Sequence, residues 1–341
     1  MFEQFIGTKP VEERHRIDVA RLEQFLGFRI FSVEQFKGGQ SNPTYKINGT
    51  FVLRRKPSGK LLPSAHAVER EYRVLSALAG TEVPVARVYG LCEDEAVIGR
   101  AFYVMDCVEG RVLWDQSLTG MSRAERAAIY DEMNRVIAAL HRVDVAAVGL
   151  HDFGRPGNYF ARQIARWSKQ YQLSATEPIA EMDRLIEWLP AHIPPGDETT
   201  IVHGDYRLDN MIFDAREPRV RAVLDWELST LGHPLADFSY HCMSWHIPPG
   251  QFRGIGGLDL PALGIPTEAQ YIRRYCERTG RTDIGHWDFY LAYNCFRLAG
   301  ILQGIVKRAL DGTASSPQAL EQGKRVRPLA EMAWAFAQKV R

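Results

Sequence analysis

The chain has few cysteines, and none of them lies in a metal-binding spacing. Its five cysteines, at positions 92, 107, 242, 276 and 295, are scattered through 341 residues without a C-x-x-C pair. An odd, scattered set of this kind argues against a disulfide framework and against a structural zinc site. Reduced thiols are typical of a cytosolic setting, so we expect a cytoplasmic protein.

A basic excess and a long apolar run are also missing. Lys and Arg number 42 against 41 Asp and Glu, which leaves a net charge of +1. Binding to nucleic acid or to a membrane surface needs a basic excess, so neither is an expected partner. The N-terminus Met1-Phe2-Glu3-Gln4 lacks the basic region of a signal peptide, and no apolar run approaches transmembrane length.

The composition that is present belongs to a globular protein, with 45% hydrophobic and 24% charged residues. A chain of this length accommodates one large two-lobed domain or two ordinary domains. No internal repeat or low-complexity run interrupts it.

The most informative stretch is residues 201–213, followed by 221–227. Short apolar strands are expected to end near Asp205, Asn210 and Asp225, so these side chains should lie close together. One carboxylate can take the proton of a hydroxyl, and an amide oxygen with a second carboxylate can hold Mg²⁺. The stretch therefore predicts a base and a metal site for phosphoryl transfer.

The spacing of this stretch matches the kinase pattern H-x-D-x-x-x-x-N followed by a second Asp. Its His-Gly-Asp form, within the segment 202–210, and the segment 224–228 resemble the aminoglycoside phosphotransferase and choline kinase superfamily. Within it, the chain resembles kinase-like domains fused to acyl-CoA dehydrogenases and their stand-alone bacterial relatives, over nearly its whole length. Further matching segments are 157–160, 166–167 and 296–301. One departure is Asp225-Trp226-Glu227, which lacks the glycine of the kinase Asp-Phe-Gly.

The resemblance implies an α+β, bilobal protein-kinase-like fold. A small antiparallel-sheet N-lobe, residues 1–108, would bind the nucleotide, and a mostly helical C-lobe, residues 109–341, would carry the catalytic and substrate sites. The sequence Asp152-Phe153-Gly154 also spells the kinase metal motif, but it precedes the catalytic stretch by about 50 residues. We interpret it as a turn without chemistry.

Local patterns predict the elements of the N-lobe. Residues 1–16 are polar and are expected to form a loose arm, and Asp18 is expected to cap a helix that ends at Leu26. Strands are expected at 30–36, 44–47 and 51–56, with a tight hairpin at Asn48-Gly49. A helix over 66–79 and a strand pair at 88–92 and 101–108 follow.

Between the first two strands lies a loop of small residues. By its context it is expected to cover the nucleotide phosphates with its backbone N–H groups. Taken alone, a Gly-rich hairpin is as often structural, and this loop is not a Walker A motif. The loop residues assigned to the nucleotide are Gly38, Gly39, Ser41 and Asn42.

The third strand should supply the cation for the α- and β-phosphates. Arg54 falls in register with the usual kinase lysine, and Lys56, two residues on, is the rival. By the resemblance, Glu71 pairs with this cation. The resemblance also places adenine against the Asp106 carbonyl and the Val108 N–H, with Met105 lining the back.

The C-lobe is expected to be mostly helical. Capping boxes at Ser122 and Thr267 predict helix starts, and Gly280 predicts a helix end. Further helices are expected at about 158–173, 177–189 and 286–310, with a last one from Ser316-Pro317. By the resemblance, Asp237 braces the catalytic loop.

We assign Asp205 as the base or orienter of the acceptor hydroxyl, and Asn210 and Asp225 as ligands of Mg²⁺. Arg207 contacts the transferring phosphoryl group or, equally, lies at the surface. His203 is expected to pack within the loop, because a hard cation prefers oxygen ligands.

The predicted function is ATP-dependent and Mg²⁺-dependent phosphorylation of a small-molecule hydroxyl. A pseudokinase scaffold is the alternative from another class, supported by Arg54 and the missing glycine. A protein kinase is disfavoured, because no Ala-Pro-Glu segment follows Asp225. ATP versus GTP and the oligomeric state stay open.

The acceptor is expected to be anionic. Residues 240–311 hold six acids and eight bases, a net of +2, whereas a site for cationic antibiotics should gather acids. Arg297 and Arg308, on the long helix with Tyr290, Tyr293, Phe296 and Gln303, could form a cationic, partly apolar wall. A hydroxyacyl-CoA or a hydroxy acid fits this wall, and an aminoglycoside-type or choline-type kinase is the alternative.

Overall fold

The computed structural model describes residues 6–38, 42–57, 59, 66–312 and 319–340. The chain forms two compact units, each built from two segments. The first unit consists of Met1–Phe153 and Arg207–Ser229, and the second of Gly154–Tyr206 and Thr230–Arg341.

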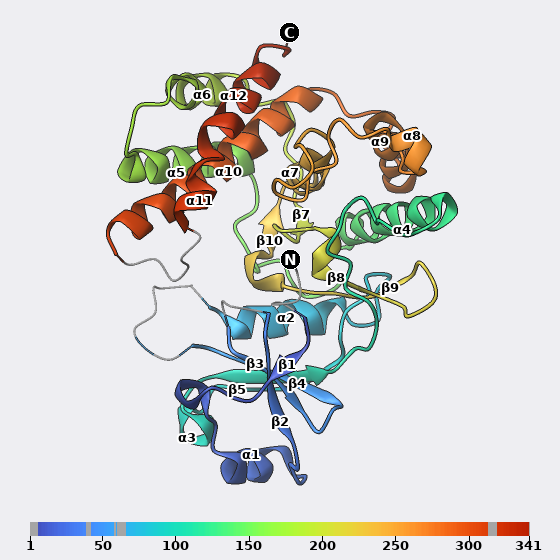
Figure 1. Cartoon of the computed structure of the whole chain (residues 1–341), viewed down its shortest axis with the longest axis vertical. Coiled ribbons are helices and arrows are strands. Elements are labelled where there is room, and N and C mark those ends of the chain that lie inside the picture. Colours follow the sequence, from blue (N-terminus) through green and yellow to red (C-terminus); the bar gives the residue numbers. More distant parts are fainter. Residues whose placement is uncertain (1–5, 39–41, 58, 60–65, 313–318, 341) are drawn as a thin grey trace. The chain divides into compact units, whose positions relative to one another are not determined.

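A six-stranded antiparallel sheet forms the centre of the first unit (Figure 1). The strand order is β1-β2-β3-β4-β6-β5, so each strand pairs with a neighbour that is close in the sequence except where β6 lies beside β4. The strands are β1 (Thr8–Lys9), β2 (Val33–Phe36), β3 (Thr44–Ile47), β4 (Phe51–Arg55), β5 (Val88–Cys92) and β6 (Phe102–Asp106).

The predicted hairpin between β3 and β4 is confirmed. Asn48 and Gly49 have φ angles of 51° and 71°, the left-handed conformation that a two-residue hairpin turn requires. The strand expected from Ile30 begins only at Val33. Two residues expected in this strand donate their backbone N–H groups to side chains instead. Ile30 donates to Glu23 at 2.6 Å, and Phe31 donates to Asn48 at 2.9 Å.

The expectation of a loose arm at the N-terminus was wrong for the described residues 6–16. Thr8 and Lys9 form β1, which pairs with Phe36 and Gln35 of β2. The Tyr45 hydroxyl then donates to the His15 carbonyl at 2.7 Å. A polar segment can serve as an edge strand because its free edge faces water, and periodicity does not reveal this in two residues.

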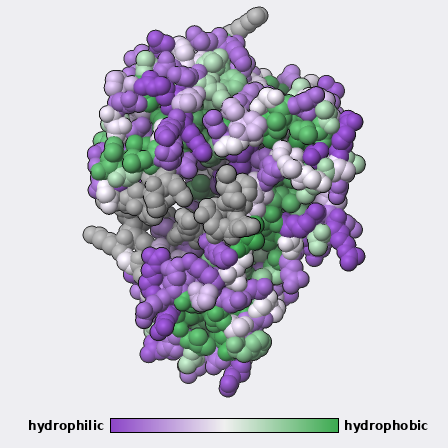
Figure 2. All heavy atoms as spheres, viewed as in Figure 1, coloured by the Kyte–Doolittle hydropathy of each residue, from purple (hydrophilic) through white to green (hydrophobic). Residues whose placement is uncertain are grey.

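Three helices accompany the sheet: α1 (Val19–Leu26), α2 (Val68–Leu78) and α3 (Glu95–Ile98). Asp18 caps α1 as predicted, accepting from the Arg21 N–H at 3.1 Å. One hydrophobic core joins α1, α3 and the sheet and includes Leu22, Tyr45, Leu53 and Phe102, all fully buried. Apolar side chains also reach the surface of this unit (Figure 2), among them Phe25, Phe31 and Tyr89.

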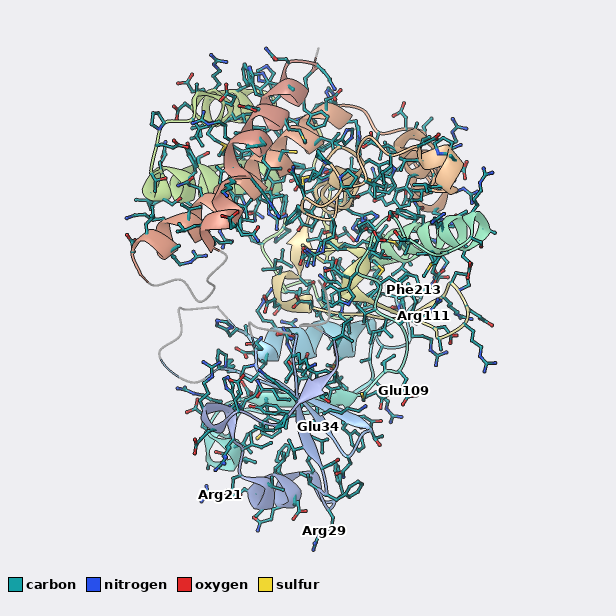
Figure 3. The ribbon with its side chains drawn as sticks, in the orientation of Figure 1. Arg21, Arg29, Glu34, Glu109, Arg111 and Phe213 are labelled. Carbon is teal, nitrogen blue, oxygen red and sulfur yellow. The ribbon has the colours of Figure 1, made fainter. Side chains whose placement is uncertain are left out.

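The first unit also contains α4 (Arg123–His141) and the hairpin of β8 (Met211–Phe213) and β9 (Val220–Val223). The Ser122–Glu125 capping box that starts α4 is confirmed. Arg111 and Phe213, labelled in Figure 3, exchange two backbone hydrogen bonds of 2.7 and 2.8 Å. This bridge attaches the segment after β6 to the β8–β9 hairpin.

The second unit is mostly helical, with one short antiparallel pair of β7 (Thr200–Val202) and β10 (Thr230–Gly232). Its long central helix α10 contacts α5, α7 and α12. The helices are α5 (Tyr159–Ser174), α6 (Ala180–Ala191), α7 (Pro234–Cys242), α8 (Leu260–Leu263), α9 (Glu268–Thr279), α10 (Trp287–Leu310), α11 (Ala319–Gly323) and α12 (Val326–Ala337).

The predicted ends of α9 are confirmed, with a Thr267–Gln270 capping box and Gly280 at φ 71°. Ser316-Pro317, the expected start of the last helix, lies outside the described residues, and two helices follow it. Among the described helices, none is both long and apolar enough to cross a membrane.

Candidate functional site

A buried ion pair joins β4, the strand expected from the sequence as the third, to α2. Arg54 on β4 places its Nε 2.7 Å from Oε2 of Glu71, and the two side chains are 10% and 2% exposed. This is the pair expected from the sequence, and it is confirmed. A charge pair so fully removed from water survives only when further polar groups surround it.

Those polar groups come from three elements of the first unit. Asn42 donates its amide to Glu71 Oε1 at 3.0 Å, and the Tyr103 hydroxyl on β6 donates to Oε2 at 3.2 Å. His66 in turn lies 3.1 Å from the Asn42 side-chain oxygen. Burial raises the pKa of the Glu71 carboxyl, and the Arg54 charge opposes that rise.

Arg54 also reaches the segment that follows β9. Its Nη2 lies 3.2 Å from Asp225 Oδ1 and 3.4 Å from Glu227 Oε2. Burial opposes the charge of Arg54, but Glu71, Tyr103, Asp225 and Glu227 together raise its pKa above the ordinary value. One guanidinium therefore connects three carboxylates, and we call this group the Arg54 network.

Asp225 has an unusual backbone. Its φ of 64° and ψ of 61° are left-handed, a conformation that non-glycine residues adopt rarely and at a cost. The short 3-10 helix Trp226–Leu228 begins directly after it. Its carboxylate is 37% exposed, so the strained residue presents an oxygen donor to solvent while remaining tied to Arg54.

Asn210 lies at the same end of the β8–β9 hairpin as Asp225. The Leu224 N–H donates to the Asn210 carbonyl at 2.8 Å, and Met211 pairs with Val223. Asn210 accepts this hydrogen bond and Asp225 follows its donor, so the two residues are close along the backbone. Both have side-chain oxygens that can bind a metal ion. No cage of three or more His, Cys, Asp or Glu residues occurs in the described part of the chain.

Lys56, the rival cation, has a different partner. Its Nζ lies 2.8 Å from Glu69 of α2, with side chains 24% and 36% exposed. Arg207 forms an ion pair of 3.6 Å with the buried Asp209. That contact orients Arg207 toward its own loop.

The tripeptide Asp152-Phe153-Gly154, which spells the kinase metal motif, contacts α2 through its first two residues. Asp152 pairs with Arg73, and the Phe153 carbonyl accepts from Arg70 at 2.6 Å, with the Arg70 guanidinium 4.2 Å from the Phe153 ring centroid. These contacts give the tripeptide a packing role.

The expected nucleotide loop and hinge are only partly described. Gly38 follows β2, whereas Gly39 and Ser41 lie outside the described residues. Asn42 is fully buried, and its side-chain amide donates to Glu71. A contact of Asn42 with a phosphate would therefore be made by its backbone. On the hinge segment, Met105 pairs with Val52, the Asp106 N–H donates to the Arg87 carbonyl, and the Cys107 N–H donates to Thr50.

In the second unit, Asp205 sits in a loop that is held from α7. The Asp237 carboxylate accepts from the N–H groups of His203 and Gly204, both at 2.8 Å. The fully buried His203 accepts the Asp205 N–H through Nδ1 at 3.2 Å. These contacts agree with the predicted packing of His203 within the loop and with the predicted bracing of the loop by Asp237.

Two further residues at this loop were not assigned a role there from the sequence. The Tyr240 hydroxyl donates to Asp205 Oδ1 at 2.6 Å, and Arg297 donates to the Gly204 carbonyl at 3.1 Å. They lie 35 and 93 positions from their partners, so no local spacing indicates these bonds. The helical register of Tyr240 with Asp237, three residues apart on α7, is the one signal that could have suggested it.

Of the six residues expected to form a cationic, partly apolar wall on α10, four are buried: Tyr290, Tyr293, Phe296 and Gln303. Tyr293 and Phe296 are fully buried, and Tyr293 packs edge-on against Phe160. Gln303 donates to the Ser174 carbonyl at 2.8 Å, and Arg308 is exposed. Of the residues expected there, Arg297 alone lies at the loop that carries Asp205.

Comparison with known proteins gives the class. Residues 32–290 match the family model described as the phosphotransferase enzyme family. A crystal structure described as "a putative aminoglycoside phosphotransferase" from Ralstonia eutropha JMP134 is 64% identical. It covers 96% of this chain and 100% of that chain, with a TM-score of 0.89. The kanamycin and GDP complex of an aminoglycoside 2″-phosphotransferase shares the fold, with a TM-score of 0.63 at 16% identity over 92% of this chain and 96% of that chain.

The chain belongs to the phosphotransferase enzyme family. Its expected α+β kinase-like fold and its class as a small-molecule kinase are confirmed. Among curated proteins it resembles acyl-CoA dehydrogenase family members 10 and 11 of Mus musculus. It is 47% and 41% identical to them over 98% and 95% of its own length. The chain spans only 32% and 44% of those two relatives.

Proposed function

We propose that the protein uses ATP and Mg²⁺ to phosphorylate a hydroxyl group of an anionic small molecule. The observation that carries this proposal is the Arg54 network. In it, Arg54 of β4 lies within 3.4 Å of Glu71 on α2 and of Asp225, the candidate metal ligand. Residues 1–108 would serve as the nucleotide lobe and 109–341 as the catalytic and substrate lobe. The five free cysteines are consistent with a cytoplasmic setting.

Arg54 would hold the α- and β-phosphates, because a guanidinium can bind two oxygens at once. Glu71 fixes that guanidinium from α2, as the lysine–glutamate pair does in protein kinases. Backbone N–H groups of residues 38–42 would meet the phosphates, and the adenine would meet the Asp106 carbonyl and the Val108 N–H beside Met105.

Asn210 and Asp225 fit a magnesium ion. Mg²⁺ is usually held by one or two carboxylates with substrate phosphates, not by a cage of protein ligands, and this pair offers one carboxylate and one amide oxygen. When bound, the ion would neutralise charge on the phosphates. The tie from Arg54 to Asp225 keeps the carboxylate oriented at the hairpin end before nucleotide arrives.

Asp205 would accept the proton of the acceptor hydroxyl. Its loop is held at the backbone by Asp237 and Arg297, so the carboxylate needs little reorganisation. Arg207, paired with Asp209 at 3.6 Å, would contact the transferring phosphoryl group.

The proposed acceptor is a hydroxyacyl group on coenzyme A or a free hydroxy acid. The net charge of +2 over residues 240–311 and the similarity to domains of acyl-CoA dehydrogenase family members support it. ADP release should be measured with hydroxyacyl-CoA thioesters, hydroxy acids, kanamycin and choline side by side. Turnover of kanamycin alone would contradict the anionic acceptor and support an antibiotic kinase instead.

The pseudokinase alternative predicts nucleotide binding without transfer. The intact Arg54–Glu71 pair argues against decay of the site, because a buried pair without function is costly to keep. Nucleotide binding with no ADP release over the whole panel, and no ATP hydrolysis without acceptor, would favour the scaffold.

A further inference from the structure

The loop that carries Asp205 has its backbone groups bonded to α7 and α10 of the second unit. Asp237 takes two N–H groups, and Arg297 donates to the Gly204 carbonyl. Gly204 itself has φ 85°, which suits glycine and lets the chain turn between His203 and Asp205. These contacts fix the backbone but not the rotation of the Asp205 side chain.

The Tyr240 hydroxyl is the contact that reaches that side chain. Its donor–acceptor distance of 2.6 Å to Asp205 Oδ1 lies in the range of charge-assisted O–H···O⁻ bonds, roughly 2.5–2.7 Å. Tyr240 is 8% exposed, while Asp205 is half-buried. A short bond from a rigid, buried donor restricts the carboxylate plane, which a solvent-exposed partner would not do.

Tyr240 is itself held on both sides. The Arg297 guanidinium lies 5.1 Å from the Tyr240 ring centroid and 5.8 Å from that of Trp167. On another side, the Phe252 ring meets Tyr240 edge-on, with centroids 6.5 Å apart. Phe252 and Arg253 have φ angles of 35° and 58°, so the backbone is strained where it brings Phe252 to this ring.

We propose that Tyr240 is a positioning residue that sets the orientation of the Asp205 carboxylate toward the acceptor hydroxyl, with Arg297 bracing both its ring and the loop. The proposal rests on the proposed role of Asp205. The alternative is that the Tyr240 hydroxyl stands in the place of the acceptor hydroxyl and is displaced when the acceptor binds. The two accounts differ in what removal of the hydroxyl does.

The test is Tyr240→Phe, which keeps the ring and removes the donor. Positioning predicts that kcat falls by on the order of 10- to 100-fold, because a misplaced reacting group loses near-attack geometry, with KM for both substrates nearly unchanged. Arg297→Lys should lower kcat in the same direction, since lysine keeps the charge but loses the planar contact with Tyr240.

Tyr271→Phe is the matched control. Its hydroxyl is likewise buried and hydrogen-bonded, and the partner is His241 of α7 at 2.8 Å. We expect this variant to lose thermal stability comparably and to keep its kcat. A comparable loss of kcat in Tyr271→Phe would show a merely structural effect and overturn the proposal.

Thermal unfolding adds a readout that needs no acceptor. Because the Tyr240 bond ends on Asp205, the decrease in Tm caused by Tyr240→Phe should shrink when Asp205 is already Ala. An unchanged kcat in Tyr240→Phe, or a lower acceptor KM at full kcat, would overturn the proposal. Full turnover in Asp205→Asn would instead refute the proposed function, so the two failures are distinguishable.

Discussion

The Arg54 network and the Asp205 loop hold their carboxylates by different means. In the first unit, ion pairs hold the carboxylates: the Arg54 guanidinium lies within 3.4 Å of Glu71, Asp225 and Glu227. In the second unit, a neutral phenol and backbone N–H groups hold Asp205 and its loop. Removing a charge from the network should therefore damage stability and nucleotide binding together, whereas changes at the loop should lower turnover and leave nucleotide binding intact.

The largest effect is expected from Asp205→Asn. Loss of proton transfer to the carboxylate should lower kcat by roughly 10²–10⁴-fold, while the nucleotide Kd stays nearly constant because Asp205 faces the acceptor. Turnover and nucleotide binding should be measured on the same preparation. Unchanged turnover would remove Asp205 from the mechanism.

Next comes Asp225→Ala, which should weaken Mg²⁺-dependent nucleotide binding by about 100-fold or more, since even indirect partners of a metal contribute 10–100-fold. The control is Asp152→Ala, which removes the carboxylate of Asp152-Phe153-Gly154 and its ion pair with Arg73. Titrations of nucleotide with and without Mg²⁺ check both. Equal Mg²⁺ dependence in the two variants would contradict the metal assignment.

Arg54→Ala should act on both stability and binding. Breaking a buried pair leaves Glu71 uncompensated, so the free energy of unfolding should fall by about 3–5 kcal/mol, and KM for ATP should rise. Lys56→Ala removes a partly exposed pair and should cost about 1 kcal/mol or less. Denaturant unfolding and ATP kinetics of both variants check this, and the reverse ranking would assign the phosphate role to Lys56.

The smallest expected effect is a pH dependence in Arg54→Ala. Burial already raises the pKa of Glu71 above its ordinary 4.5, and without Arg54 the opposing charge is gone. The folded variant then keeps a proton that the unfolded chain releases, so the contribution of Glu71 to stability is fully present below pH 4.5 and is lost as pH rises through the raised folded pKa. Unfolding midpoints of variant and wild type across pH 4.5 to 8 measure the difference between them, which should widen with pH.

The sequence predicted the parts of the fold whose causes are local. The turn at Asn48-Gly49 needs positive φ, and the caps at Ser122 and Thr267 satisfy N–H groups one turn away, so a few adjacent residues decide each structure. The arm and the start of β2 were wrong because distant side chains decided them, such as Asn48 for Phe31.

The same distinction applies to the candidate site. Arg54 and Glu71 were found because both fall at fixed places on neighbouring elements of a known pattern, and Lys56 was separated from Arg54 by its exposed partner Glu69. Tyr240 and Arg297 were missed as partners of the Asp205 loop, since their bonds depend on how α7 and α10 pack. Periodicity gives the buried face of a helix but not the atom that each side chain reaches.

The left-handed backbone of Asp225 and its carboxylate contribute to stability with opposite signs. Glycine adopts φ 64° without strain, so Asp225→Gly relieves a backbone cost of about 1 kcal/mol or more while removing the candidate metal ligand. The same change takes a carboxylate away from the buried Arg54, so the relief of backbone strain is offset by the lost ion pair, and the network itself keeps the strained residue in place.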